Sequence, residues 1–225
     1  MPKRIFDKHK EHTPYFNAAG KRVPSVTTIT GTQIGWKGKN LERWNNKMGL
    51  KGIDTEKYVG DKAQIGTLAH AYCTDFLLQK KTNDDDYSKN QIIEARRSFQ
   101  GFYKWTKLHK IRPILIEGKL VSEKYQYGGT CDIYAEVDGV PELADLKTGA
   151  GVYIDMVVQV AAYAHLLEEN GKEVERVRII NIPRSEDETF IDPEITSMIQ
   201  LGWNCFMRAR YNYEDWLELQ KIRSF

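Results

Sequence analysis

Residues 125–149 read YQYGGTCDIYAEVDGVPELADLKTG, and this stretch decides the fold. Two segments rich in strand-forming residues flank Asp138-Gly139, a pair typical of tight hairpin turns. Side chains alternate between the two faces of a strand, so Asp145 and Lys147 share one face, and the hairpin brings the strand of Asp132 beside them. The stretch therefore predicts two carboxylates and one ammonium group converging at one end of a sheet.

The residues on either side of this hairpin predict a mixed α/β protein. Apolar residues at helical spacing indicate helices, and runs rich in β-branched and aromatic residues indicate strands. The expected helices cover 39–50, 61–80, 89–109, 155–169 and 192–222, and the expected strands cover 114–120, 125–137, 140–147 and 176–182. Residues 23–29 indicate a short extended piece, with Ser25 or Thr27 able to cap the next segment. The order predicts a central mixed β-sheet flanked by helices, with a helical N-terminal part.

Composition narrows the class of protein. Hydrophobic residues make up 41% and charged residues 28%, which is ordinary for a folded domain. No apolar run is long enough to cross a membrane or to act as a secretory signal, so we expect no membrane partner. Three scattered cysteines favour free thiols in a reducing cytoplasm over disulfides, a zinc ribbon or an iron–sulfur cluster.

Charge is unevenly distributed along the chain. Residues 1–51 hold eleven Lys and Arg against three acids, a net charge of +8, whereas the rest of the chain, whose total is +2, carries −6. A basic part beside an acidic body is typical of a protein that grips phosphates with one region and holds metal ions with another. A solvated basic face without a partner is the alternative.

Asp132, Asp145 and Lys147 suit metal-assisted hydrolysis of a phosphodiester. Mg²⁺ prefers oxygen ligands from one or two carboxylates and keeps waters and substrate phosphate as its other ligands. The metal lowers the pKa of a water and neutralises charge on the phosphate, and a nearby ammonium group orients the water or stabilises the same charge. We therefore expect both aspartates and the carbonyl of Leu146 to bind metal and Lys147 to act on the water or the charge.

A helix after the D-x-K strand carries a second polar pair. Gln159 and Tyr163 are four residues apart and share one face, with Asp155 one turn earlier. This face either borders the metal site or is simply a polar helix edge with a tyrosine partly in the core.

Two further candidates precede the hairpin. His70 follows Gly66 by four residues on an expected helix and is either a further metal ligand or a structural histidine. Glu117, in the first expected strand, could aim at the same site. A solvated strand position is the other interpretation of Glu117, and Glu123 competes with it for the role.

In this order the segments resemble the RecB-type branch of the PD-(D/E)XK nuclease superfamily. That branch shows a G-x-x-x-H helix, an acidic residue, a G-x-x-D strand, a D-x-K strand and a Q-x-x-x-Y helix. The matching segments here are 66–70, Glu117, 129–132, 145–147 and 159–163. The resemblance covers about residues 60–182 and implies a restriction-endonuclease-like core. It further implies that His70, Asp132 and Asp145 bind metal and that Lys147 is catalytic, with Glu117, Gln159 and Tyr163 in the same centre.

The segments 24–28 and 41–44 are similar to the N-terminal part of mitochondrial genome maintenance exonucleases and of small phage exonucleases. This similarity implies an Mg²⁺- or Mn²⁺-dependent DNA exonuclease that prefers single strands and feeds a free end past the metal site. Relatives with an iron–sulfur cluster use four cysteines, a set that this chain lacks, so no cluster is expected. The sequence has no G-x-x-x-x-G-K-[ST] motif, so a helicase or recombination partner would supply any unwinding.

We expect residues 1–60 to form a basic DNA-binding segment packed on the core, and residues 61–225 to form the nuclease core with a C-terminal helix. Trp44 lies on an apolar stripe and is expected in the core, whereas Trp36 is open between packing and base stacking. Solvent exposure is expected for Arg96 and Arg97, and a place along a DNA channel is their alternative.

Two competing functions keep the same residues. One is a structure-selective endonuclease of the same fold, and the other is a non-catalytic DNA-binding accessory protein of recombination, repair or replication. The expected location is the cytoplasm of a bacterium or of a phage-infected cell.

Overall fold

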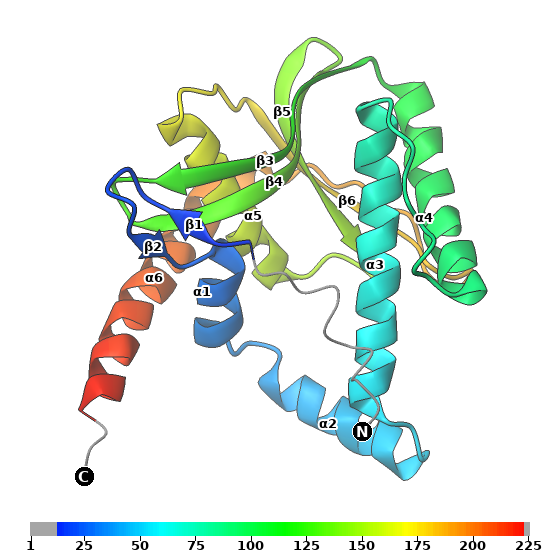
Figure 1. Ribbon diagram of the computed structural model, residues 1–225, viewed down its shortest axis with the longest axis horizontal. Coiled ribbons are helices and arrows are strands. Elements are labelled where there is room, and N and C mark those ends of the chain that lie inside the picture. The colour runs from blue at the N-terminus through cyan, green and yellow to red at the C-terminus, as the bar shows by residue number, and fades with distance from the viewer. Residues whose placement is uncertain (1–12, 223–225) are drawn as a thin grey trace.

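A four-stranded sheet forms the centre of the structure, a computed structural model that describes residues 13–222 (Figure 1). Its strands run in the order β3 (Ile111–Ser122), β4 (Tyr127–Val137), β5 (Val140–Thr148) and β6 (Arg176–Ile182). The pairs β3–β4 and β4–β5 are antiparallel, and β5–β6 is parallel because a helix crosses between those two strands. The predicted mixed α/β fold with a central mixed sheet is confirmed.

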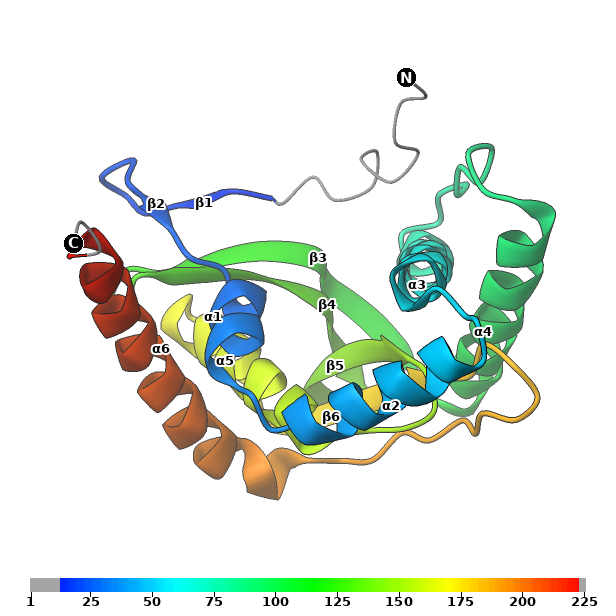
Figure 2. The same cartoon turned by 90° about the horizontal axis from the view of Figure 1, so that it is seen from below.

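Helices cover both faces of this sheet (Figures 1 and 2). The helices α1 (Val26–Gln33), α5 (Ile154–Glu169) and α6 (Ile199–Lys221) share one hydrophobic core with the sheet. The helices α3 (Thr55–Leu77) and α4 (Lys89–Leu108) share the second core on the other face. A small hairpin of β1 (Tyr15–Phe16) and β2 (Arg22–Val23) contacts β3 and β4.

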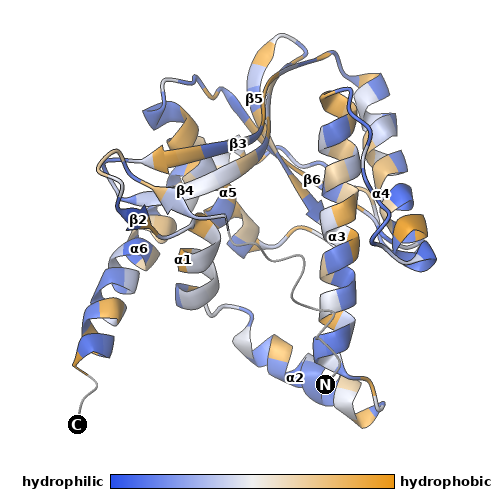
Figure 3. Cartoon of the chain, viewed as in Figure 1, coloured by the Kyte–Doolittle hydropathy of each residue, from blue (hydrophilic) through white to orange (hydrophobic). Residues whose placement is uncertain are grey.

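The helix α2 (Gly38–Leu50) connects α1 to α3 and has no buried residue. Its ribbon alternates hydrophilic, neutral and hydrophobic colours, whereas β5 and β6 carry long hydrophobic stretches (Figure 3). No helix within residues 13–222 is both long and apolar enough to cross a membrane.

The extended piece predicted over 23–29 is wrong beyond β2, because α1 begins at Val26. The side chain of Ser25 accepts a hydrogen bond of 2.9 Å from the amide of Thr28 and caps the helix. β-branched residues such as Val26 and Ile29 disfavour a helix locally, but both are completely buried in the first core. Burial of this face outweighs the local preference.

Two other predicted boundaries shift for identifiable reasons. The side chain of Asp54 caps α3, so this helix starts six residues before the predicted position 61, and the expected boundary between residues 60 and 61 lies inside it. The helix predicted over 192–222 begins too early, because Ile191 and Glu194 form isolated bridges to β6, with the pairs Asn181↔Ile191 and Arg178↔Glu194. A single 3₁₀ turn follows before α6 begins. The predicted strand 176–182 is confirmed without change.

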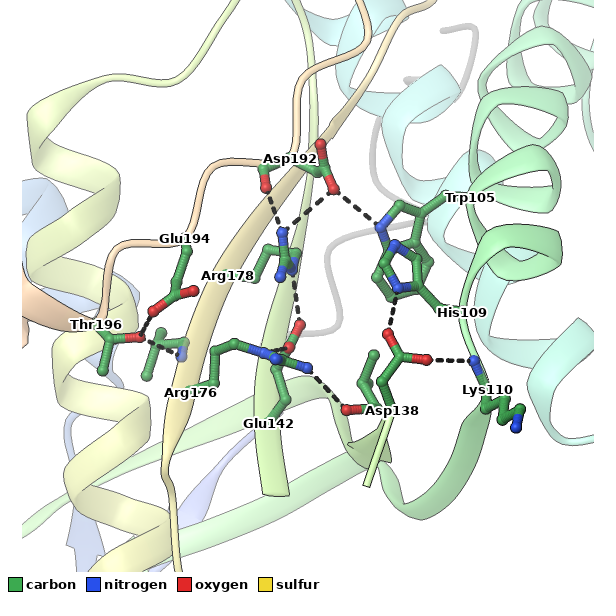
Figure 4. Close-up of polar contacts among 12 residues, drawn as sticks. Trp105, His109, Lys110, Asp138, Glu142, Arg176, Arg178, Asp192, Glu194 and Thr196 are labelled. Atoms are coloured by element: carbon green, nitrogen blue, oxygen red, sulfur yellow. Dashed lines mark hydrogen bonds and ion pairs between the residues drawn. The ribbon is translucent and has the colours of Figure 1, made fainter. Parts of the chain in front are cut away.

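A buried ionic network holds the segment after β6 against β5 and α4 (Figure 4). Glu142, fully buried on β5, is paired with the guanidinium groups of Arg176 and Arg178 on β6. Asp192 accepts a hydrogen bond of 3.0 Å from the indole of Trp105 on α4 and also contacts Arg178. A buried carboxylate is tolerated only when it is paired in this way, so the network specifies how the three elements meet.

Gly202 allows α6 to pack closely on α5. A Cβ atom at this position would lie 2.9 Å from the Cβ of Ala161 and 3.0 Å from the carbonyl oxygen of Val157. Backbone cannot yield to such a contact as a flexible side chain can, so a larger residue here would separate the two helices.

We expect Gly202→Ala to lower the free energy of unfolding by about 1–3 kcal/mol, because the methyl group overpacks the helix contact. Gly49→Ala is the matched control, since that glycine is also helical and has open space around it. The control should be neutral or stabilising by up to about 1 kcal/mol, the usual gain of alanine in a helix. Urea unfolding monitored by circular dichroism measures both. Equal stabilities of the two variants would show that α5 and α6 can separate without cost.

Candidate active site

The site begins where β4 and β5 part. Their ladder runs from Val137↔Val140 to Ile133↔Ala144 and ends there. At the next position the carboxylate of Asp132 accepts a hydrogen bond of 2.8 Å from the backbone amide of Leu146. The side chain thus satisfies an amide that would otherwise pair with the neighbouring strand, and the space between the strands opens beyond it.

Asp145 and Lys147 lie on the face of β5 predicted from their spacing. Asp145 is buried, and its carboxylate forms an ion pair with the ammonium group of Lys147, which reaches a pocket. Burial raises the pKa of Asp145 to about 6 despite the opposing effect of Lys147. For Lys147, burial favours the neutral amine, but the carboxylates of Asp145 and Asp132 outweigh it, so its pKa lies above the usual value. At neutral pH this lysine is a cation.

His70 reaches the carboxylates from α3. Its Nδ1 atom is 3.6 Å from Oδ2 of Asp132, too far for a direct hydrogen bond. Burial, and then the charge of Lys147, lower the pKa of His70 to about 4. The imidazole is therefore neutral at physiological pH and has a lone pair available for a metal ion.

Gly66 explains how α3 comes so close. A Cβ at this position would meet the hydroxyl oxygen of Thr148, at the end of β5, at 2.8 Å. His70 follows one turn later on the same side of the helix, so the absent side chain of Gly66 sets the distance between His70 and the carboxylates.

The structure distinguishes between the two glutamates that the sequence leaves open. Glu117 lines the same pocket as Asp132, whereas Glu123 lies at the β3–β4 turn, where it accepts a hydrogen bond from the amide of Ala18. The backbone of Glu117 has φ +50°, a left-handed conformation that costs energy for a residue other than glycine. Such strain is frequent at functional sites because the surrounding structure must impose it.

The carboxyl group of Glu117 is electrostatically crowded. The residue is exposed at the rim of the pocket, yet partial burial of its carboxyl group raises its pKa to about 7, with further increases from Asp132, Asp75 and Asp145. Burial likewise raises the pKa of Asp132, against the opposing effects of Lys147 and the Leu146 amide. The pocket therefore holds more negative charge than its one lysine compensates.

Gln159 and Tyr163 lie on α5, and Tyr163 is buried near Asp145. The amide of Gln159 donates a hydrogen bond of 2.8 Å to the hydroxyl of Tyr163, and that buried phenol is close enough to feel the charge of Asp145. Gly129 provides the room, because a Cβ there would lie 2.7 Å from the ring of Tyr163. The pair therefore lies behind the carboxylate, in contact with the strand of Asp132.

Several of the predicted site residues line one pocket of about 560 Å³, whereas Asp145, Gln159 and Tyr163 are not among its lining residues. It is lined by His70, Glu117, Asp132, Leu146 and Lys147, all singled out from the sequence. Asp75 also lines it and was missed. Its signal was the spacing of Thr67, Ala71 and Asp75, four residues apart on the face of α3 that carries His70.

The donors in this pocket fit a divalent cation by their chemistry. Carboxylate oxygens and a backbone carbonyl are the ligands that Mg²⁺ and Mn²⁺ prefer, and a neutral imidazole can join them. The 3.6 Å between His70 and Asp132 is slightly more than the roughly 3 Å between neighbouring ligands of an octahedral ion with 2.1 Å bonds. Within residues 13–222 no three His, Cys, Asp or Glu side chains already stand as a closed metal-binding group. The donor set fits a cation whose binding draws them together.

Several residues considered for DNA contact lie away from this pocket. Trp36 is exposed, whereas Trp44 is half-buried with its ring 6.0 Å from that of Tyr58. Arg96 is exposed and Arg97 half-buried, and they are paired with Asp84 and Glu186 respectively. Of the basic residues expected to contact DNA, Lys3, Arg4, Lys8 and Lys10 lie outside the described residues.

Asp155 lies at the start of α5. It forms an ion pair of 2.7 Å with Lys37, the N-cap residue of α2, so this contact joins the exposed helix to the segment that follows the D-x-K strand.

No model of a known protein family matches the chain, and no curated protein matches it. Among solved structures, one from Eubacterium rectale, described as a "putative exonuclease", is similar over 66% of this chain and 68% of that one, with 11% identity and a TM-score of 0.41. The structure of SSO0001 is similar over 71% of this chain and 87% of its own, with 15% identity and a TM-score of 0.30. At these values neither similarity bears on the activity of this chain.

We expect Gly66→Ala to lower the free energy of unfolding by about 1–3 kcal/mol, because its methyl group collides with Thr148. Thr148→Ala removes the colliding hydroxyl, so the double variant should recover most of that loss. Urea unfolding of the wild type, both single variants and the double variant gives the coupling energy. Purely additive effects would mean that this contact does not set the position of α3.

Glu117→Gln tests the electrostatics of the pocket. In EDTA the contribution of this group to stability should fall as pH rises from about 5 to about 8, since a raised pKa means that the folded chain holds the proton more tightly and loses it near pH 7. The variant should flatten this fall in Tm, and Mg²⁺ should restore wild-type stability at the higher pH. Glu123→Gln, outside the pocket, is the control and should keep the wild-type profile. Superimposable profiles of Glu117→Gln and the wild type would exclude crowding at this carboxyl group.

Proposed function

We propose that this chain is a metal-dependent deoxyribonuclease that hydrolyses phosphodiester bonds, acting as an exonuclease on single-stranded DNA with a free end. One observation carries the proposal. Four elements, α3, β3, β4 and β5, bring His70, Glu117, Asp132 and Lys147 to one pocket, and Asp145 is paired with Lys147. Structural ion pairs rarely concentrate this much uncompensated negative charge around a single lysine and a neutral histidine.

In this proposal Asp132, Asp145, His70 and the carbonyl oxygen of Leu146 would hold Mg²⁺ or Mn²⁺. The ion would supply Lewis acidity and neutralise charge on the phosphate. Holding a cation would also relieve the repulsion among the carboxylates, because each of them has a raised pKa without it.

Lys147 acts as a fixed positive charge. Its raised pKa keeps it protonated, so it does not serve as a base near neutral pH. A half-buried ammonium group beside the pocket instead stabilises negative charge that develops on the phosphate oxygens and orients the attacking water. The ion pair with Asp145 holds the ammonium group in position before substrate arrives.

Glu117 is the group suited to exchange a proton with water. Its pKa is about 7 in the absence of a cation, and a bound cation would favour the ionised carboxylate, the form that accepts a proton from water. Tyr163 is hydrogen-bonded to Gln159 and buried near Asp145, so it would exclude water from that side of the carboxylate.

The preference for single strands is supported by features outside the pocket. The exposed helix α2 and its flanks carry five lysine and arginine residues, of which Lys39, Arg43, Lys47 and Lys51 have no ion-pair partner within the described chain. The ring of Trp36 is exposed at its start. Positive charge beside an available aromatic ring is the combination that binds single strands without regard to sequence. A partner that unwinds DNA would supply such strands.

We expect wild-type protein with Mg²⁺ or Mn²⁺ to degrade linear single-stranded DNA and to leave a closed single-stranded circle intact. Asp145→Asn and Lys147→Ala should lower the rate roughly 100- to 1000-fold, the usual effect of removing one electrostatic contact to a transition state. Binding of DNA should persist in both variants. Gel electrophoresis of strands labelled at either end measures the rate and gives the polarity.

EDTA and the control variant Asp187→Asn, which removes an exposed carboxylate outside the pocket, complete this experiment. Cutting of the circle would show that the protein is a structure-selective endonuclease and not an exonuclease. Binding without cleavage in any metal would replace both by a non-catalytic DNA-binding protein.

A further inference from the structure

Tyr15 packs against β4, the strand that carries Asp132. The hairpin of β1 and β2 places its ring on Gly128, where a Cβ would lie 2.4 Å from Cγ of the tyrosine. Gly128 also donates a backbone hydrogen bond of 2.9 Å to the carbonyl of Pro24, directly after β2. At the far end of the hairpin, Asn17 donates a side-chain hydrogen bond of 2.7 Å to Gln126. The position of the phenol is therefore fixed from both sides.

The hydroxyl of Tyr15 meets the hydroxyl of Thr130 at 2.7 Å. Two hydroxyl groups carry two protons, and a hydrogen bond between them uses one. No other hydrogen bond to either hydroxyl is present within residues 13–222, so one O–H remains free to donate to an anion. Both residues are only half-buried, so this donor is accessible.

Thr130 lies next to the proposed metal pocket. It precedes Asp132 by two residues on β4, so the two side chains share a face and are roughly 7 Å apart along the strand. Across the ladder, Lys119 of β3 is the direct partner of Thr130, which brings its Cβ to about 5 Å from that of the threonine. Lys119 is exposed and has no ion-pair or hydrogen-bond partner in the described chain.

We propose that Lys119 and the hydroxyl pair of Tyr15 and Thr130 form a binding subsite for the phosphodiester next to the one that is cleaved. An ammonium group and an outward O–H on one face are suited to a single phosphate group, the first as a charge and the second as a hydrogen-bond donor. The subsite rests on the proposed function, because the metal pocket beside it defines which phosphate is next. It makes no contact with a base and therefore serves any DNA sequence.

Binding of a fluorescein-labelled single-stranded oligodeoxynucleotide in EDTA, measured by anisotropy over a range of KCl concentrations, tests the charge. We expect Lys119→Gln to reduce the slope of log K against log salt by about 0.7 and to weaken binding about fivefold at 0.1 M salt, the effect of one lost phosphate contact on a single strand. Lys119→Arg should restore the slope. Lys172→Gln, which removes an exposed lysine at the far end of α5, should match the wild type.

Cleavage of the linear strand tests the hydroxyl pair. The double variant Tyr15→Phe/Thr130→Val removes both hydroxyls while it keeps the ring and the branched side chain. It should raise KM roughly tenfold, leave kcat within about twofold and leave the salt slope unchanged. Tyr211→Phe is the matched control, and thermal unfolding of each variant shows whether the hairpin remains folded.

The outcomes separate this subsite from the nuclease activity. If the wild type cleaves DNA, but the folded variants keep its salt slope and its KM, the subsite is overturned and the proposed function remains intact. If Lys119→Gln reduces the salt slope but the wild type does not cleave DNA, a phosphate contact at Lys119 is supported and the proposed nuclease activity is overturned. Failure of the wild-type protein to bind the oligonucleotide overturns the subsite.

Discussion

One backbone amide sets the geometry on which the candidate site depends. The amide of Leu146 donates to the carboxylate of Asp132 instead of to the main chain of β4, so these strands cannot continue their ladder past this point. The strand β5 remains paired with β6 as far as Thr148, so β5 keeps its direction and the gap stays open on the side of β4. The same hydrogen bond that ends the ladder also orients the carboxylate, and a stable backbone interaction thereby holds an acidic side chain at the mouth of the pocket.

Three glycines determine what can approach this gap. Gly66 allows α3 to approach the end of β5. Gly129 and Gly128, on opposite faces of β4, allow the rings of Tyr163 and Tyr15 to approach that strand. In each case the missing side chain is replaced by a named neighbour within van der Waals contact. The glycines at 66 and 129 belong to the two motifs that end in His70 and Asp132, which gives those motifs a steric reason.

The sequence predicts what depends on local spacing. The turn at Asp138-Gly139, the strand 176–182 and the shared face of Asp145 and Lys147 all follow from periodicity, and the structure has them as expected. Features that depend on contacts between residues distant in sequence could not be predicted. The helix α1 forms because of burial against α5 and α6, the choice between Glu117 and Glu123 depends on where β3 crosses α3, and Tyr15 meets Thr130 across 115 positions. No local sequence pattern predicts these three features, because the stabilising free energy comes from packing against residues distant in sequence.

The strand β5 carries two charged assemblies on opposite faces: Glu142 with its arginines on one, and Asp145 with Lys147 on the other. Because Glu142 and Asp145 are separated by an odd number of positions, the length of the preceding turn decides which face each occupies. Loss or gain of one residue in the short turn before β5 would exchange the two faces, directing Lys147 into an apolar core and stripping Glu142 of its partners. The length of this turn is therefore constrained as tightly as its residue types, since both Asp138 and Gly139 have positive φ.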